Sequence, residues 1–282
     1  PGRSGRTFEG QILEILTDRW IKATETKSNR YPGLPFETEG LDSIQTRKKT
    51  YQKFVKDFLR CAAAIDDNIG KMLDYLKEND LEENTIVIYT ADQGYFLGEH
   101  GMMDKRMFLE ESLRMPFVIK YPKEIPAGKR IDDIILNIDF PSLLLDYAAI
   151  SQPDSFQGKS FRQNLRLDTP SDWRKHMYYR YYAHAKNRPS HMGIRTNQHK
   201  LIFYYGHPLG LKGTYTKQTT PPAWEFYDLE NDPMELSNQY NNIKNKVVIA
   251  QLKKDLLNLR TELGDAQTDT YQLKKILKNY WE

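Results

Sequence analysis

Apolar residues between positions 51 and 76 recur at steps of three and four, which is the period of one face of an α-helix. The positions on this face are Phe54, Phe58, Cys61, Ala62, Ile65, Ile69, Met72, Leu73 and Leu76. Cys61 lies on the stripe and is expected to be a buried structural thiol. A β-branched run at residues 85–89 then predicts a fully buried strand.

A second run of elements follows the first. Residues 116–121 predict a strand, and residues 137–149 predict a helix with Asp139 as its N-cap and Pro141 at an early position. Upstream, residues 9–23 predict a short helix. Alternation of helices and strands is typical of an α/β fold, so we assign residues 1–151 to an α/β portion.

The pattern changes near Ser151. Short runs separated by Gly and Pro predict strands at residues 175–182, 192–196, 200–205 and 225–228. A final helix is expected at residues 244–263, with Gly264 as its C-cap. Residues 152–282 therefore form, on this interpretation, an α+β subdomain with a small antiparallel sheet and a terminal helix.

Composition narrows the class of protein. Hydrophobic residues make up 39% and charged residues 28% of the 282 positions, as in folded globular proteins. The formal charge of +3 is too small to indicate a nucleic-acid partner. The single cysteine excludes an internal disulfide, and no apolar run approaches the roughly 20 residues that a membrane span needs.

The segment directly after the first predicted strand carries the best candidate chemistry. Asp92 and Gln93 would lie at the carboxyl end of that strand, where open α/β sheets bind ligands. Their hard oxygen atoms suit Ca²⁺ or Mg²⁺, whereas the bland alternative is a turn-forming aspartate. Lys105 could neutralise an oxyanion near the same loop, and its alternative is an ordinary solvated lysine.

Many motifs in one order carry a resemblance over roughly residues 50–260. They are Asp92-Gln93-Gly94, Gly98-Glu99-His100-Gly101, Asp104-Lys105-Arg106, Glu110-Glu111-Ser112-Leu113-Arg114, Asn137-Ile138-Asp139-Phe140-Pro141, Gly193-Ile194-Arg195-Thr196 and Glu225-Phe226-Tyr227-Asp228. Together they resemble the sulfatases of the alkaline-phosphatase-like superfamily. The similarity is greatest to carbohydrate sulfatases, such as N-acetylglucosamine-6-sulfatases, mucin-desulfating enzymes and iduronate-sulfatase-like enzymes.

The resemblance implies a fold and a set of roles. The α/β portion would be part of an alkaline-phosphatase-like sheet with helices on both faces. Asp92 and Gln93 match ligands of a divalent cation, Ca²⁺ more than Mg²⁺, and Lys105 matches the lysine that contacts the sulfate. His100 and His191 are candidates for contact with a sulfated sugar, although His100 could instead hold the glycine loop.

Two further expectations concern the loop and the nucleophile. Glu110, Glu111 and Arg114 are expected to form a local network of ion pairs. Sulfatases use a formylglycine made within a Cys/Ser-x-Pro-x-Arg motif, which this sequence lacks, since Cys61 precedes three alanines. We therefore interpret the chain as a C-terminal part that lacks the formylglycine half and is inactive alone.

The partners follow from this interpretation. The substrate would be a sulfated sugar, and exposed apolar sheet surface would be covered by the missing N-terminal half or by self-association. The family suggests a periplasmic, secreted or lysosomal location. Two alternatives stay open at this point, a phosphodiesterase or phosphatase of the same superfamily and a non-catalytic carbohydrate-binding fragment.

Overall fold

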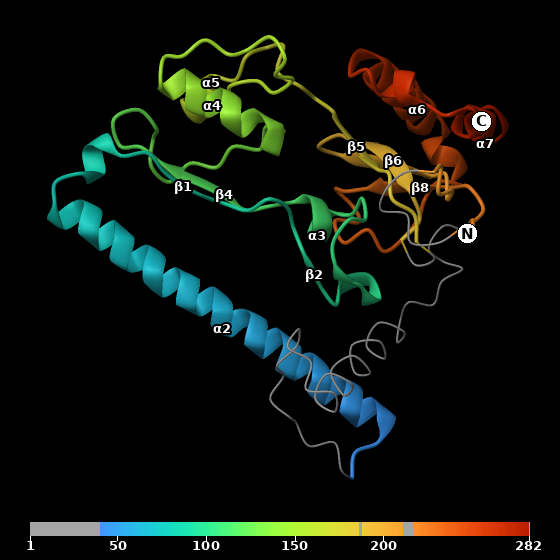
Figure 1. The fold of residues 1–282 in the computed structure, drawn as a ribbon, viewed down its shortest axis with the longest axis horizontal. Coiled ribbons are helices and arrows are strands. Elements are labelled where there is room, and N and C mark those ends of the chain that lie inside the picture. Colours follow the sequence, from blue (N-terminus) through green and yellow to red (C-terminus); the bar gives the residue numbers. More distant parts are fainter. Residues whose placement is uncertain (1–39, 186–187, 211–216, 282) are drawn as a thin grey trace. The chain divides into compact units, whose positions relative to one another are not determined.

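A computed structural model describes residues 40–185, 188–210 and 217–281 (Figure 1). The helix expected at residues 9–23 lies outside the described residues. The described chain forms two compact units, which are treated separately. The first, here the α2 unit, consists of residues 40–87 and 95–105, and the second, here the sheet unit, consists of residues 88–94 and the described residues from 106 onward.

The α2 unit is built on one long helix. Helix α2 (Ser43–Glu78) confirms the predicted helix and begins earlier than expected, because Asp42 and Gln45 form a capping box at its start. Strands β2 (Phe96–Leu97) and β3 (Met103–Asp104) pair antiparallel in the same unit. The other short helices of this unit are η2 (Glu82–Asn84) and η3 (Glu99–Gly101).

The apolar stripe of α2 is exposed over much of its length. Phe58, Ile65 and Met72 each expose more than two fifths of their surface. Cys61 is a free, exposed thiol, so the expectation that it is buried was wrong. The stripe identified the helix correctly, but periodicity alone does not establish that another element covers every residue of the stripe.

The first strands of the sheet unit form a two-stranded sheet. Strand β1 (Val87–Thr90) pairs with β4 (Phe117–Lys120). The strand was predicted to be fully buried, but every residue of β1 is half-buried or exposed, and Tyr89 exposes 43% of its surface. A sheet of two strands cannot cover both of its own faces, which explains the difference.

One face of β4 has a covering layer. Phe117 and Ile119 point into a cluster whose buried members are Leu143, Phe161, Leu165 and Trp173. These come largely from α4 (Phe140–Tyr147) and from α5 (Arg162–Leu165), which follow the short helices α3 (Glu110–Leu113) and η4 (Asn137–Asp139). The helix predicted at residues 137–149 is thus present, with Pro141 in its first turn.

Asp139 does not cap α4 with its side chain. Its carboxylate accepts hydrogen bonds from the backbone nitrogens of Leu136 and Lys159, at 2.7 and 2.8 Å. It also forms an ion pair with Arg174, and it is fully buried. Asp139 therefore ties three loops together, which a sequence pattern over one turn could not indicate.

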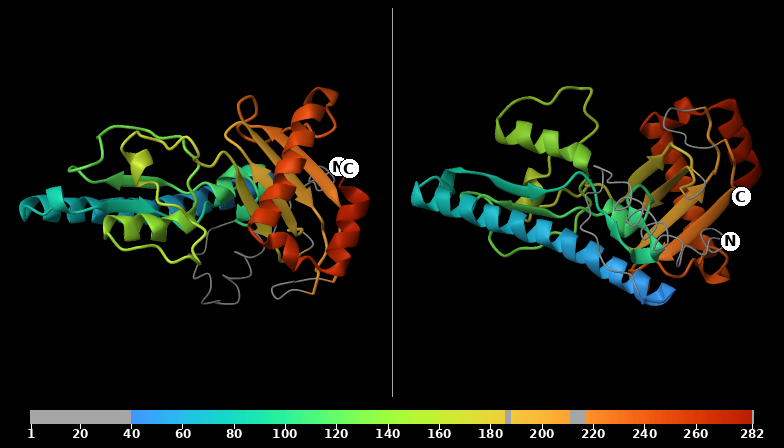
Figure 2. Two further views of the ribbon diagram at one scale, coloured as in Figure 1. Left: turned by 90° about the horizontal axis from the view of Figure 1, so that it is seen from above. Right: turned by 60° about the horizontal axis from the view of Figure 1, so that its bottom comes forward.

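The rest of the sheet unit is a four-stranded antiparallel sheet in the order β5-β6-β7-β8. Its strands are β5 (Met177–Tyr181), β6 (His191–Arg195), β7 (His199–Tyr204) and β8 (Ala223–Asp228). Helices α6 (Lys246–Glu262) and α7 (Tyr271–Tyr280) pack on one face (Figure 2), with η5 (Ile243–Asn245) and η6 (Asp265–Thr268) beside them. The predicted small antiparallel sheet and the mixed fold class are thereby confirmed. Helix α6 ends just before Gly264, as predicted, and Gly264 has a left-handed backbone conformation.

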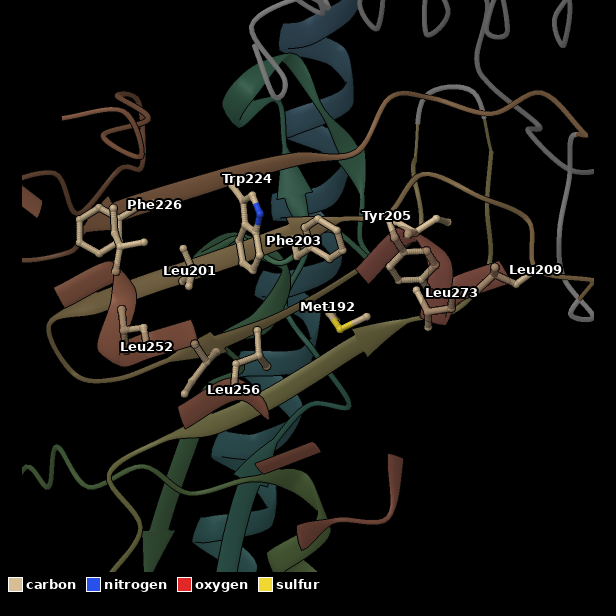
Figure 3. Packing of buried hydrophobic residues seen from close by; sticks show 13 residues of the cluster. Met192, Leu201, Phe203, Tyr205, Leu209, Trp224, Phe226, Leu252, Leu256 and Leu273 are labelled. Carbon is tan, nitrogen blue, oxygen red and sulfur yellow. The ribbon is translucent and has the colours of Figure 1, made fainter. Parts of the chain in front are cut away.

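The core of this sheet is closed. Alternate residues of β6, β7 and β8 meet side chains of α6 and α7, as Figure 3 shows for Phe203, Trp224 and Leu256. Helix α7 was not predicted. The boundary expected near residue 152 stays a prediction, and no described helix is long and apolar enough to span a membrane.

Candidate functional site

Asp92 and Gln93 directly follow β1, where the chain turns out of the sheet. Asp92 is exposed and Gln93 is half-buried, and the Gln93 amide nitrogen donates a hydrogen bond to the Asp92 carboxylate at 3.1 Å. The next residue, Gly94, donates its backbone N–H to the Ser112 carbonyl at 3.0 Å. A Cβ atom on Gly94 would lie 2.1 Å from the Glu111 carbonyl oxygen, so only glycine fits here.

A hollow of about 1550 Å³ opens beside this pair. Its wall includes β4 and the loop that follows β4. The larger sheet contributes Tyr179 from β5, Arg195 from β6 and Asn197 from the turn between β6 and β7. The hollow therefore places an oxygen-rich pair, a guanidinium group and a tyrosine along one concave surface. The Arg195 guanidinium is bonded to the Glu110 carboxylate, which lines the same surface.

Metal binding by the pair stays a prediction, with which its chemistry can be compared. The Asp92 carboxylate and the Gln93 amide oxygen are hard ligands of the kind that Ca²⁺ binds, and Gln93 contacts Asp92 through its nitrogen, not its oxygen. Ca²⁺ takes about six to eight oxygen ligands, however. No group of three or more His, Cys, Asp or Glu side chains able to hold a metal occurs within the described ranges. The pair thus fits one side of such a site and needs further ligands to complete it.

His100 and Lys105 lie on the β2–β3 hairpin of the α2 unit. His100 is in η3 with a backbone φ of +55°, and its ring meets the buried Phe96 ring edge-on at 6.1 Å. Both side chains are half-buried. The contact with Phe96 is compatible with a role for His100 in holding the loop, and the predicted roles of both residues stay predictions.

His191 lies on β6 and is fully buried. Its Nδ1 donates a hydrogen bond to the Pro189 carbonyl at 2.7 Å, and the rings of Tyr179, Tyr181 and Tyr204 surround it at 5.2–5.8 Å. Burial lowers the pKa of His191 to about 4, which keeps the imidazole neutral near pH 7. Its predicted substrate contact stays a prediction.

The network around Glu110 differs from the local one that the sequence suggested. Its carboxylate accepts two hydrogen bonds of 3.0 Å from Arg195 and forms an ion pair of 2.8 Å with Lys200. Arg114 stands 3.9 Å away, at the limit of an ion pair. Burial would raise the pKa of Glu110, but Arg195 and Lys200 outweigh burial and lower it to about 2.

Sequence reasoning missed Lys200 and Glu235. Lys200 is fully buried and lies 2.7 Å from Glu235, which is buried as well. A lysine inside the otherwise apolar strand β7 was the available signal. Its partners are 90 and 35 residues away in the sequence, so no local pattern could identify them.

Comparison with known proteins gives the context of this site. The family described as "N-sulphoglucosamine sulphohydrolase, C-terminal" matches residues 98–262, and the family described as "Sulfatase" matches residues 17–150. The chain belongs to the sulfatase family. The resemblance seen in the sequence motifs is thereby confirmed.

Relatives of this sulfatase chain include carbohydrate enzymes. It is 41% identical over 251 residues to the N-acetylglucosamine-6-O-sulfatase of Bacteroides thetaiotaomicron, covering 88% of this chain and 41% of that protein. It is 29% identical to an arylsulfatase of Clostridium perfringens, covering 83% of this chain and 45% of that protein. The chain thus spans less than half the length of these relatives.

Solved structures agree in fold. The structure of BT4656 in complex with its substrate, D-glucosamine-2-N,6-O-disulfate, matches with a TM-score of 0.72 and 35% identity, over 88% of this chain and 47% of that one. The phosphonate monoester hydrolase of Agrobacterium radiobacter matches with a TM-score of 0.60 over 77% of this chain and 42% of that one. At 21% identity, the second likeness shows a shared fold only.

Proposed function

We propose that this chain forms the C-terminal part of a sulfatase that hydrolyses a sulfate ester of a sugar, with the 6-O-sulfate of a glucosamine derivative as the substrate. The observation that carries the proposal is its identity to two relatives, a sulfatase named for N-acetylglucosamine 6-O-sulfate and a sulfatase solved with a 6-O-sulfated glucosamine.

In this proposal each predicted residue keeps a distinct task. Asp92 and Gln93 supply some of the oxygen ligands of a divalent cation, Ca²⁺ in preference to Mg²⁺. When bound, the cation would supply positive charge at the sulfate oxygens. Lys105 donates a hydrogen bond to the sulfate and offsets charge on the ester oxygen as the bond to sulfur breaks. His100 and His191 keep the roles in sugar binding that the motifs predict, with His191 acting indirectly because its side chain is fully buried.

The nucleophile and the remaining metal ligands would come from the part of the fold that this chain does not span. The sequence contains no Cys/Ser-x-Pro-x-Arg motif from which a formylglycine could form. The same part would cover the open face of the β1–β4 sheet, where Val118 exposes 63% of its surface. This chain alone would therefore bind and orient but not hydrolyse.

A chimera tests the proposal. The part of the B. thetaiotaomicron relative that this chain does not match is joined to this chain, and sulfate release from N-acetylglucosamine-6-sulfate is measured. We expect turnover by the chimera, none by the chain alone, and a loss of at least about 100-fold on Lys105→Ala, since removing one donor to a developing charge has an effect of that order. Lys254→Ala on α6, an exposed lysine, is the matched control and should leave the rate unchanged.

Two results would contradict the proposal. If the chain alone releases sulfate, a nucleophile lies within it and the assignment of roles is wrong. If the chimera folds, cleaves a phosphonate monoester and leaves the sugar sulfate intact, the site belongs to a phosphoryl hydrolase and not to a sulfatase.

A further inference from the structure

Helix α3 and the three residues before Glu110 form a wedge against the larger sheet. Met107, Phe108 and Leu109 are all buried, and the Phe108 ring stacks on Tyr179 with 5.2 Å between centroids. The wedge reaches the sheet at Gly193, where a Cβ atom would lie 2.5 Å from the Phe108 ring. A glycine in the middle of β6 weakens a strand by itself, so its presence here is explained by this close approach.

The other side of α3 holds two loops. Ser112 is buried, and its carbonyl accepts the N–H of Gly94, the residue after the Asp92–Gln93 pair. Its hydroxyl oxygen accepts the N–H of Arg106, the residue after Lys105, at 2.7 Å. One buried serine therefore fixes the backbone next to both predicted ligand-binding positions.

Two carboxylates and a lysine fasten α3 to the sheet. Lys200 lies between Glu110 and Glu235, at 2.8 and 2.7 Å, with no exposure to solvent. Glu235 also accepts the backbone N–H of Glu110, which starts α3, at 2.8 Å. Buried ion groups seldom stabilise a fold more than apolar residues would, and their best-attested use is to specify one arrangement of the chain.

We infer that Lys200 and Glu235 are positioning residues, which hold α3 in one place on the sheet and thereby set the backbone beside Asp92 and beside Lys105. Any effect of these residues on catalysis rests on the proposed function. The chain of contacts from Lys200 to the backbone of Gly94 and Arg106 does not depend on that function. The link runs from Lys200 through Glu110 to α3, and from Ser112 to the two loops.

Amide hydrogen exchange of the 282-residue chain tests the link. In Lys200→Met, which keeps most of the length of the side chain and removes its charge, the N–H groups of Gly94 and Arg106 should exchange at least about tenfold faster. Amides in the centre of β8 should change by less than about threefold, because the core under α6 does not depend on this cluster. The double variant Lys200→Met with Glu235→Gln also removes the carboxylate that Lys200→Met leaves buried without its cation. Because both positioning residues are then altered, exchange at Gly94 and Arg106 should stay faster than in the unaltered chain.

A second buried ion cluster of the same sheet serves as the matched control. Asp265 pairs with Arg180 and Arg260 beside β5 and α6. Asp265→Asn should loosen the C-terminal helices but leave exchange at Gly94 and Arg106 unchanged. If Lys200→Met does not fold, Glu235→Gln alone keeps the hydrogen bond to α3 and should speed both amides by roughly threefold.

The outcomes separate this inference from the proposed function. Unchanged exchange at Gly94 and Arg106 in a folded Lys200→Met variant, or an equal effect of Asp265→Asn, would overturn the inference. In the chimera, Lys200→Met should lower kcat at least about tenfold with little change in KM, because Lys200 does not border the hollow. A chimera without turnover would refute the proposed function and leave the exchange result standing.

Discussion

The sheet unit contains one closed sheet and one open sheet. In β7 every residue after His199 is buried. Leu201 and Phe203 pack in the cluster with α6 and α7, and Lys200 on the other face lies over the Phe108 ring of the wedge. In β4 the burial alternates with exposure, because only the face with Phe117 and Ile119 has a covering layer. Both strands are apolar in sequence, so the difference lies in their surroundings and not in their composition.

This contrast shows which sheet is covered by other elements of the chain and which has an open face. One face of the four-stranded sheet packs on α6 and α7, which follow it in the sequence, and Phe108 contacts the other face at Tyr179 and Gly193. The β1–β4 sheet resembles part of a larger sheet whose remaining elements are not among the described residues, since Val118 and Tyr89 are exposed to solvent. A sulfatase relative is more than twice as long as the matched segment, which agrees with an additional covering part.

The largest expected effect distinguishes the two sheets directly. Phe226→Ala removes a fully buried ring from the closed core and should lower the free energy of unfolding by about 3–5 kcal/mol. Val118→Ala, on the open face, should change it by less than about 0.5 kcal/mol. Urea denaturation followed by circular dichroism and tryptophan fluorescence measures both, and equal losses would refute the contrast.

The closed sheet should also be the acid-sensitive one, through His191. Its pKa of about 4 in the fold lies below the ordinary value of 6.5, so between these pH values the unfolded chain binds a proton that the folded chain does not. The contribution of His191 to the free energy of unfolding is therefore fully present above pH 6.5. It is lost as the pH falls toward 4, and the loss amounts to about 3 kcal/mol.

His191→Asn isolates that contribution, because the asparagine amide can still donate to Pro189 but does not titrate. Unfolding free energies of the chain and of the variant are compared at pH 7 and at pH 4.5. We expect the variant to lose distinctly less stability on acidification. A parallel loss in both proteins would show that other groups determine the acid response.

A smaller effect is expected where the wedge meets the sheet. Gly193→Ala places a methyl group against the Phe108 ring and should destabilise by about 1–3 kcal/mol, the range typical of overpacking. Thermal unfolding measures this loss. The double variant Gly193→Ala with Phe108→Leu relieves the contact with the ring but not the 2.6 Å approach to the Leu201 carbonyl oxygen, so part of the stability should return. No recovery would show that the ring of Phe108 is not a source of the loss.

The smallest effect has the opposite sign and lies on the exposed helix α2. Gly70 lies inside this helix with open space around it. Gly70→Ala should therefore raise stability by about 0.5–1 kcal/mol through helix propensity alone. A destabilised Gly70→Ala variant would indicate that a partner surface already approaches this face of α2.

The sequence predicted helices and strands better than it predicted which of their residues are buried. The apolar period of α2 and the short strands of the larger sheet were visible because 3.6-residue and two-residue periods are local properties. The exposure of Cys61 and the half-burial of β1 were not visible, since burial depends on which distant segment covers a stripe.

The candidate site divides in the same way. Asp92, Gln93 and Lys105 could be selected because motif order and a strand end are readable along the chain. Lys200 and Glu235 could not be selected, because their proposed role depends on contacts with Glu110. These two residues lie 90 and 125 positions after Glu110 in the sequence. The enclosure of His191 by three tyrosines likewise follows from the pairing of β5, β6 and β7.

The central claim is that this chain is one part of a sulfatase fold whose open sheet a second part covers. Amide exchange of β4 and β7, compared between the chain alone and the chimera, tests this claim most directly. We expect β4 to gain at least about tenfold protection in the chimera while β7, slow in both, stays unchanged. Equal exchange of β4 in the two proteins would contradict the claim.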